Sequence, residues 1–497
     1  TLIGGLAGDA LTTGFNNVAL GYFALGGEDT GRKNVAIGVS ALKVQNSDAD
    51  NFNTAVGFEA GQSVTTGRFN SLVGGLAGDA FTTGEHNTAL GYQALTSDTA
   101  GSRNVAIGSN SLNSQNGVTG TVYNVAVGYG AGQNVTTGVE NTILGGLAGD
   151  ALTTGGQNVA LGYTALTADT VGSKAVAIGF RSLGAQNYGT ATDNYNVAVG
   201  YDSGRSVTTG IYNTLLGGLA GDALTDADHN VAIGFNALSA DTLGSGSVAI
   251  GQGTLNVQNF TTATSTLNTA VGYQAGTSVT SGVHNTLIGG QTGDALTQGA
   301  RNTAVGVAAL TADTLGQYST AIGYGALSVQ NQTTAVNTYN VAVGYLAGEN
   351  VTTGIKNTLV GGEAGDAITT GDQNVAVGYL ALTSNQTADG NTAIGVGALN
   401  DTTGATNTAV GQLAGFAVSS GASNTYIGNQ AGDGATTGSS NICVGANATL
   451  ATAGTSNAIT IGIGINAAAN DFSFGKASNV VTNDFDTDAN WSRSSDE

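Results

Sequence analysis

The sequence has no proline, no methionine, one cysteine and only three histidines in 497 residues. A single cysteine rules out a disulfide framework, and we expect Cys443 to be a small buried hydrophobe. No apolar run reaches the roughly 18 residues that a membrane-spanning helix needs, and no signal peptide is visible. These absences disfavour a disulfide-stapled domain and predict no membrane insertion.

Charge is also scarce, at 9% of residues, and mostly negative, with a net charge of −21. This balance argues against a nucleic-acid partner and against attraction to anionic membranes. Glycine is abundant (81 residues), but without proline and a Gly-X-Y period the chain is not collagen. Because Thr1 already occupies the second position of a repeat and Met is absent, we expect a fragment or a processed product.

A short phrase returns about every 17 residues: an Asn, two small or aliphatic residues, then Ile, Val or Leu, then Gly. Asn17 to Gly21 and Asn34 to Gly38 are two of its 26 copies in residues 1–457. The Gly is present in every copy. A fixed short period of this kind predicts a solenoid, in which each coil contacts only its neighbours.

The coils are of four kinds, which alternate in a cycle of about 72 residues. The first carries Gly-Gly-x-x-Gly-Asp, the second Gly-Tyr-x-Ala-Leu, the third Gln-Asn followed by a longer loop, and the fourth Ala-Gly-x-x-Val-Thr-Thr-Gly. Asn is replaced in only three copies, at Ala175, Ser247 and Ser319, and these are also spaced by 72. The cycle is therefore part of the architecture.

The predicted fold is all-β: a parallel β-roll or β-helix solenoid of about 26 short coils. Each coil offers two short strand candidates, Val-Ala-Ile-Gly and the Asp-Ala-Leu-Thr segment that follows it. The Gly column, with Gly21 and Gly38, predicts positive φ or close approach between coils. The Asn column, with Asn17 and Asn34, predicts a ladder of stacked side-chain amides that bond from coil to coil.

One coil supplies only two or three aliphatic side chains to its interior, a weak core for a single chain. The small middle residues Ala19, Ala36 and Ala55 would let strands of neighbouring chains approach closely, so we expect a parallel homotrimer. The period breaks near residue 458. We therefore divide the chain into a repeat shaft, 1–457, and a C-terminal capping segment, 458–497.

No catalytic constellation is visible, and we expect neither enzymatic activity nor a cofactor. Asp9, Asp79 and Asp150 recur only every fourth coil, which favours turn-capping residues. In a trimer they offer weak candidates for a divalent-cation site. Two alternatives stay open: a polysaccharide-cleaving enzyme, which needs a carboxylate pair in a groove between coils, and ice binding through the Thr-Thr pairs.

The longer loops of the third coil kind are the candidate receptor-contact regions, because they vary where the remainder is strict and carry aromatic residues. These loops are Ser47–Asn53, Gly117–Asn124, Tyr188–Asn196, Phe260–Asn268 and Gln332–Asn340, and their aromatic residues are Phe52, Tyr123, Tyr188, Tyr195, Phe260 and Tyr339. The competing interpretation is that these rings pack between coils or against a neighbouring chain.

Two resemblances follow from these motifs. The Asn-x-Ala-Ile-Gly coil resembles the head repeat of trimeric autotransporter adhesins, a parallel β-roll that trimerises. The segment Trp491 to Glu497 resembles the junction before the intramolecular chaperone of phage tail fibres and tail spikes. In that family the chaperone cleaves itself off after a Ser that precedes an Asp, and the matching pair here is Ser495 and Asp496.

Together these features predict a homotrimeric viral fibre shaft, a phage tail fibre or related virion appendage outside the cell. Its expected partners are its own copies, other virion tail proteins, and a glycan or protein receptor on the host surface. The alternative is the head of a bacterial trimeric surface adhesin.

Overall fold

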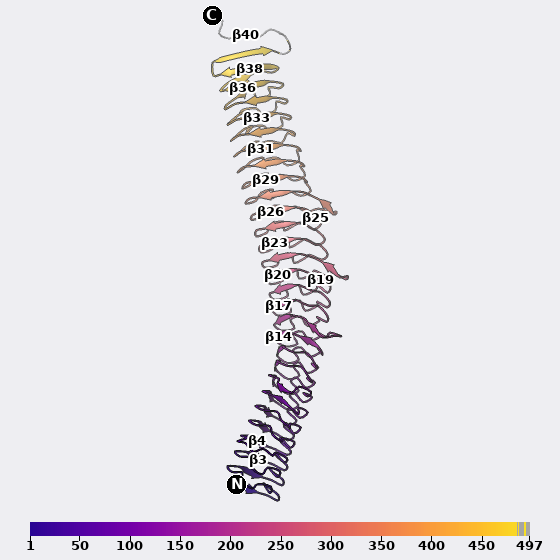
Figure 1. The fold of residues 1–497 in the computed structure, drawn as a ribbon. Coiled ribbons are helices and arrows are strands. Elements are labelled where there is room, and N and C mark those ends of the chain that lie inside the picture. Colours follow the sequence, from indigo (N-terminus) through magenta and orange to yellow (C-terminus); the bar gives the residue numbers. More distant parts are fainter. Residues whose placement is uncertain (485, 487–491, 494–497) are drawn as a thin grey trace. The chain divides into compact units, whose positions relative to one another are not determined.

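A computed structural model describes residues 1–484, 486, 492 and 493. This part of the chain consists of short strands and turns and contains no helix, hence none that could cross a membrane. The chain divides into two compact units, each treated separately below: residues 1–247 with 259–265, and residues 248–258 with 266–497. In both, short parallel strands stack coil upon coil (Figure 1).

Unit 1 is a stack of parallel strands, one in each coil, joined by turns. The strands are β1 (Leu2–Ile3), β2 (Val18–Leu20), β3 (Val35–Ile37), β4 (Thr54–Val56), β5 (Ser71–Val73), β6 (Thr88–Leu90), β8 (Val105–Ile107), β10 (Val125–Val127), β11 (Thr142–Leu144), β12 (Val159–Leu161), β14 (Val176–Ile178), β16 (Val197–Val199), β17 (Thr214–Leu216) and β18 (Val231–Ile233). Three long loops each contain a short strand that pairs in parallel with a short strand of the preceding coil. These pairs are β7 (Gly101–Ser102) with β9 (Gly120–Thr121), β13 (Gly172–Ser173) with β15 (Thr192–Asp193), and β19 (Gly244–Ser245) with β21 (Thr264–Ser265).

Unit 2 repeats this arrangement and ends in an antiparallel cap. Its strands are β20 (Val248–Ile250), β22 (Thr269–Val271), β23 (Thr286–Ile288), β24 (Thr303–Val305), β26 (Thr320–Ile322), β28 (Val341–Val343), β29 (Thr358–Val360), β30 (Val375–Val377), β31 (Thr392–Ile394), β32 (Thr408–Val410), β33 (Thr425–Ile427), β34 (Ile442–Val444), β36 (Ile459–Ile463), β38 (Asp471–Lys476), β39 (Asn479–Asp484) and β40 (Ser492–Arg493), with the short pairs β25 (Gly316–Gln317) and β27 (Val336–Asn337), and β35 (Thr449–Leu450) and β37 (Asn466–Ala467).

Parallel stacking continues past residue 457, because β36 pairs with β34 and β38 pairs with β36. The strands then reverse: β39 pairs antiparallel with β38, and β40 with β39. A hairpin of longer strands thus occupies the C-terminal edge of the sheet in unit 2, at the yellow end of Figure 1.

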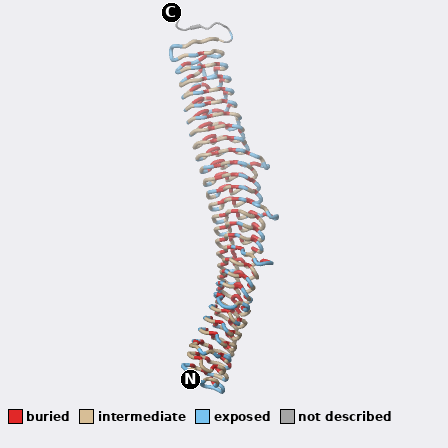
Figure 2. The backbone as a smooth tube through the Cα atoms, in the orientation of Figure 1, coloured by how far each residue is buried: buried red, intermediate tan, exposed pale blue. Residues whose placement is uncertain are grey.

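The interior of each coil is built from small side chains. Every three-residue strand buries its middle residue, for example Ala19, Ala36 and Ala55, while its two neighbours face outward. Strand residues alternate between faces, so only one residue of three points inward. Figure 2 shows these buried positions recurring in coil after coil. The middle alanines therefore fill the interior of a single chain, and the expectation that they lie between neighbouring chains is wrong.

The expectation of two strands per coil is also wrong. The segment predicted as the second strand, Asp9 to Thr12 in the first coil, forms turns and a bend. In most coils it follows two positions in the left-handed region of φ, such as Glu59 (+55°) and Gly61 (+58°). Backbone hydrogen bonds still join the coils there, for example from Leu76 N to the Phe58 carbonyl at 2.8 Å. The second side of the coil is therefore a hydrogen-bonded turn.

The Gly that ends each repeat phrase was predicted to have a positive φ or to lie close to the next coil, and it does both. Gly57 has φ of +144°, and a Cβ built on it would lie 2.4 Å from the carbonyl oxygen of Gly74 in the next coil. A side chain at this position would clash with the backbone of the next coil, which cannot shift without moving the coils apart. The Gly column sets how closely the coils stack.

Interior packing accounts for one difference between the coil kinds. The second and third kinds place a buried Leu at a left-handed position, such as Leu42 with φ of +48°. The first and fourth kinds have Gly there, because bulky residues of adjacent coils need the space. A Cβ on Gly61 would lie 2.6 Å from Leu72 Cδ1 and 3.0 Å from Leu42 Cδ2.

Candidate interaction surface

The outward face formed by the three-residue strands is uncharged in both units. The third residue of every three-residue strand is Leu, Ile or Val, and the first is Val, Thr, Ser or Ile. Examples in unit 1 are Leu90, 46% exposed, and Leu144, 42% exposed; Ile288 in unit 2 is 39% exposed. A continuous column of half-exposed aliphatic side chains on a soluble surface is typical of an interaction site.

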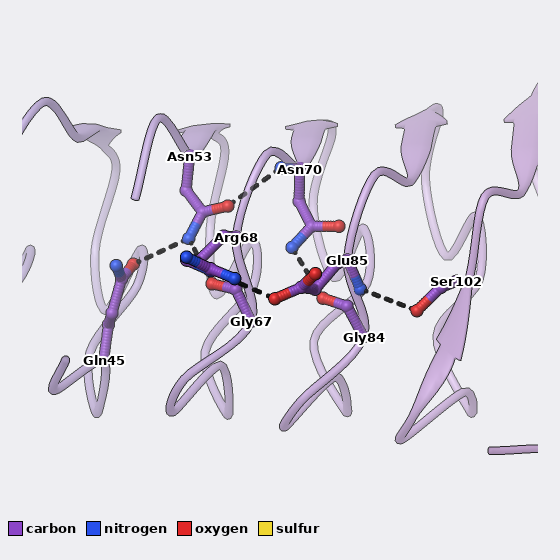
Figure 3. A network of polar contacts seen from close by, with 8 residues as sticks. All are labelled: Gln45, Asn53, Gly67, Arg68, Asn70, Gly84, Glu85 and Ser102. Atoms are coloured by element: carbon purple, nitrogen blue, oxygen red, sulfur yellow. Dashed lines mark hydrogen bonds and ion pairs between the residues drawn. The ribbon is translucent and has the colours of Figure 1, made fainter. Parts of the chain in front are cut away.

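Buried asparagines connect the coils next to this face. Asn53 Nδ2 donates to the carbonyl oxygen of Gly67 at 2.8 Å, and its Oδ1 accepts from the backbone N–H of Asn70 at 2.9 Å. Asn70 repeats both bonds one coil further along: its Nδ2 donates to the Gly84 carbonyl (Figure 3), and its Oδ1 accepts from the backbone N–H of Asn87. The amides thus bond mainly to the backbone of the next coil, and not mainly to one another as the stacked-amide ladder predicted.

Asn17 and Asn34 are the first members of this column. Asn17 makes both bonds, to the Gly31 carbonyl at 2.9 Å and from the backbone N–H of Asn34 at 2.9 Å. Asn34 belongs to the third coil kind, and its Nδ2 has no hydrogen-bond partner; the same holds for Asn391 in the third-kind coil of the last cycle. Because the third kind gains least from Asn, its replacement by Ala or Ser is tolerated there. In the coil of Ala175, Asn194 Oδ1 accepts the next N–H at 3.0 Å.

The six candidate loop aromatics fall into two groups. Four lie directly before a ladder Asn and are exposed: Phe52 (48%), Tyr123 (53%), Tyr195 (46%) and Tyr339 (49%). The other two lie at the start of their loops and are buried: Tyr188 (5%) and Phe260 (8%).

Tyr188 acts as a structural clamp, since its hydroxyl donates to the Gly210 carbonyl at 2.8 Å. Burial raises the pKa of Tyr188 above its usual range. Of the six aromatics, Phe52, Tyr123, Tyr195 and Tyr339 are therefore the ones that present a ring to solvent.

The long loops are anchored by buried carboxylates that the sequence analysis did not single out. Asp98, 1% exposed, accepts from Gln115 Nε2 of the next coil at 2.7 Å and from the backbone N–H of Gly101 at 2.9 Å. Gln115 in turn accepts from Asn124 Nδ2 at 2.9 Å. The acids buried at this position of the cycle are Glu28, Asp98, Asp169, Asp241 and Asp313, and the matching glutamines are Gln45, Gln115, Gln186, Gln258 and Gln330.

Three of these carboxylates also hold the beginning of the loop itself. Glu28 accepts from Ser47 N at 3.2 Å, and Asp241 and Asp313 accept from the corresponding loop N–H groups. In the last cycle the third-kind coil has no long loop, and Asn385 and Thr402 replace the acid and the glutamine. The acid–glutamine pair thus occurs with the loop and is lost with it, which is the signal that could have revealed the anchor in the sequence.

Burial gives these anchors a pH dependence. It raises the pKa of Glu28, Asp98, Asp169 and Asp313, outweighing the hydrogen bonds that favour the ionised form. A carboxyl with a raised folded-state pKa binds protons more readily in the folded chain. The cost of burying its charge is present at neutral pH and is relieved as pH falls through that pKa.

We therefore expect the melting temperature to rise when pH is lowered from about 7.5 to about 4.5, just above the ordinary carboxyl range. Asp50 has the opposite effect on stability, because the hydrogen bond that it accepts from Lys33 lowers its pKa. The four buried carboxyls with raised pKa outnumber it. Calorimetric or circular-dichroism melts across this range provide the measurement. A melting temperature that falls with acidification would show that the buried anchors do not dominate.

The weak cation candidates lie apart, on separate coils, and two of the three bond to threonines. Thr96 Oγ1 donates to Asp79, and Thr167 Oγ1 donates to Asp150 at 2.5 Å, while Asp9 is exposed. Within residues 1–484, 486, 492 and 493, no group of three or more His, Cys, Asp or Glu is placed to hold a metal ion.

Three further features of the sequence are the single cysteine, the Thr-Thr pairs and the C-terminal Ser-Asp pair. Cys443 is fully buried in the middle of β34, as expected for a small hydrophobe. In several Thr-Thr pairs the first hydroxyl bonds within the chain, as when Thr82 Oγ1 donates to the Thr99 carbonyl at 2.9 Å, whereas the second residue, such as Thr66, is exposed. Ser495 and Asp496 lie outside the described residues.

No family model matches the chain, and comparisons with curated proteins and with solved structures find no significant match. The two resemblances therefore stay expectations, and the function has to be argued from the geometry.

Proposed function

We propose that this protein is the shaft of a homotrimeric viral fibre, a phage tail fibre or related virion appendage. Its role is mechanical: it holds adhesive parts away from the particle and contributes to host attachment through its surface. The partners are two further copies of the same chain, other tail proteins, and a receptor on the host surface.

The observation that carries the proposal is the uncharged outward sheet face. In each unit it repeats once per coil, so copies of the same chain aligned in parallel would match residue for residue along it. A heterologous partner would need the same period to use the whole face. The negative charges lie off this face, where they do not oppose its burial.

Sedimentation of the full chain tests the proposal. We expect a trimer at low micromolar concentration, and a shift towards monomer when Leu90 and Leu144 on the sheet face are both changed to Glu, because buried unpaired charges are costly. The matched control is Val44→Glu, since Val44 is similarly exposed (43%) but lies in a turn. A monomeric parent, or equal effects of both changes, overturns the trimer.

The alternative is the head of a bacterial trimeric surface adhesin, favoured by the resemblance of the Asn-x-Ala-Ile-Gly coil. The downstream part of the gene separates the two: a membrane-anchoring domain supports the adhesin, and a chaperone domain supports the fibre.

A further inference from the structure

One corner of unit 1 gathers aromatic and basic side chains. It is formed by the residue directly before each ladder Asn, and in three successive coils this residue is Phe52, Phe69 and His86. The Phe52 and Phe69 rings stack with centroids 5.7 Å apart, and the Phe69 and His86 rings with centroids 4.7 Å apart. Lys33 Nζ lies 4.6 Å from the Phe52 ring centroid. We call Lys33, Phe52, Phe69 and His86 the aromatic corner.

The backbone of this corner does not select aromatic residues. Phe52, Phe69 and His86 have φ of +52°, +61° and +59°, a left-handed region that bulky residues such as Phe rarely adopt. Residues of many kinds occupy the equivalent position in other coils of unit 1, among them Asn16, Glu140 and Gln157, and Tyr195, Tyr212 and His229 repeat the stacked rings beside Lys174. The rings are therefore not needed to form this turn, which points to a role for what they present to solvent.

Polar groups beside the rings provide donors and acceptors in balance. Lys33 Nζ pairs with Asp50 at 2.7 Å, and Arg68 Nε pairs with Glu85 at 3.0 Å (Figure 3). Each pair is partly exposed, so outward-facing donors and acceptors remain within reach of a ligand. Arg32 shares Asp50 with Lys33, its Nη1 lying 3.8 Å from the carboxylate, so the corner has no excess of negative charge in a chain whose net charge is −21.

We propose that the aromatic corner is a binding track for an uncharged polysaccharide lying along the coil axis. Sugar rings offer apolar C–H surfaces to aromatic rings and hydroxyls to the paired Lys–Asp and Arg–Glu groups. A polyanion would be repelled by the overall negative charge. Over the described part of the chain no pocket is found, which favours a polymer held by many shallow contacts, one per coil of about 4.8 Å.

This inference rests on the adhesive part of the proposed function and names its ligand class; it does not require the trimer. The test is native affinity electrophoresis of the full chain in gels that contain dextran, mixed-linkage β-glucan or galactomannan, with alginate as the acidic comparison. We expect at least one neutral polysaccharide to retard the parent. We expect the double variant Phe52→Ala/Phe69→Ala to bind that polysaccharide at least about tenfold more weakly, a loss of about 1.4 kcal/mol in binding free energy.

The matched control is Tyr129→Ala/Tyr201→Ala, which removes two rings that are 61% and 56% exposed but lie on the other side of the strands, after the conserved Gly. It should retain binding. Retardation by no neutral polysaccharide, stronger retardation by alginate, or equal loss in both double variants overturns the proposal.

Sedimentation of the same samples separates the two proposals. If the Phe52→Ala/Phe69→Ala variant alone loses the trimer, the corner is a contact between chains and the track is overturned. If the parent is monomeric but still binds, the shaft proposal fails and the track stands.

Discussion

Replacing Gly289 by Ala is expected to destabilise the chain by about 3 kcal/mol or more. Gly289 follows β23 with φ of +138°, and a Cβ there would lie 2.5 Å from the carbonyl oxygen of Gly306 in the next coil. The strain of this φ adds to a collision with backbone, and relief requires that the two coils move apart. Since every coil bonds to the next, a local widening also breaks interstrand hydrogen bonds. Thermal or denaturant unfolding of the purified protein gives the loss.

The neighbouring residue provides the matched control. Gly290 lies outside the left-handed region, and a Cβ on it would have no atom within 4 Å. Gly290→Ala is therefore expected to be neutral or slightly stabilising, because Ala restricts the unfolded chain more than Gly does. Similar losses for both variants would mean that the conserved Gly is not required by the spacing of the coils.

The Gly and Asn columns could be predicted from the sequence because each expresses one local requirement that recurs in every coil. A position that is Gly in all copies implies a backbone that no side chain fits, and Gly57 shows this. The parallel stacking of the coils could be predicted for the same reason. The second strand was predicted from β-branched composition, and composition does not show that the segment from Asp9 to Thr12 forms turns directly after the left-handed positions of the coil.

The candidate surface was only partly predictable. Aromatic content identified the loops, but register within the coil decides exposure: Phe52 precedes a ladder Asn and is exposed, whereas Tyr188 follows the Gln-Asn pair and is buried. The carboxylate anchors were missed because an Asp in a turn is ordinary when viewed alone. Only the joint replacement of Asp and Gln in the loopless cycle, by Asn385 and Thr402, separates Asp98 from the turn-capping acids.

The second large effect is expected from Asn357→Ala. Asn357 Nδ2 donates to the Gly371 carbonyl at 2.8 Å, and its Oδ1 accepts from the backbone N–H of Asn374 at 2.9 Å. Ala removes both partners and leaves a buried donor and a buried acceptor of the next coil unsatisfied. Each unsatisfied group costs about 1–3 kcal/mol, so we expect a loss of about 2–4 kcal/mol in the free energy of unfolding.

Asn391→Ala in the same unit is the matched control. Its Oδ1 accepts from the N–H of Asn407 at 2.9 Å, but its Nδ2 is buried without a partner. Ala removes one good bond and one unsatisfied donor together, so the loss should be less than half that of Asn357→Ala. Equal losses would show that the asparagines act by filling space, whereas the expected difference would assign their stabilisation to the two bonds that each ladder Asn makes with the next coil. The same difference would explain why Ala175, Ser247 and Ser319 occur only at this point of the cycle.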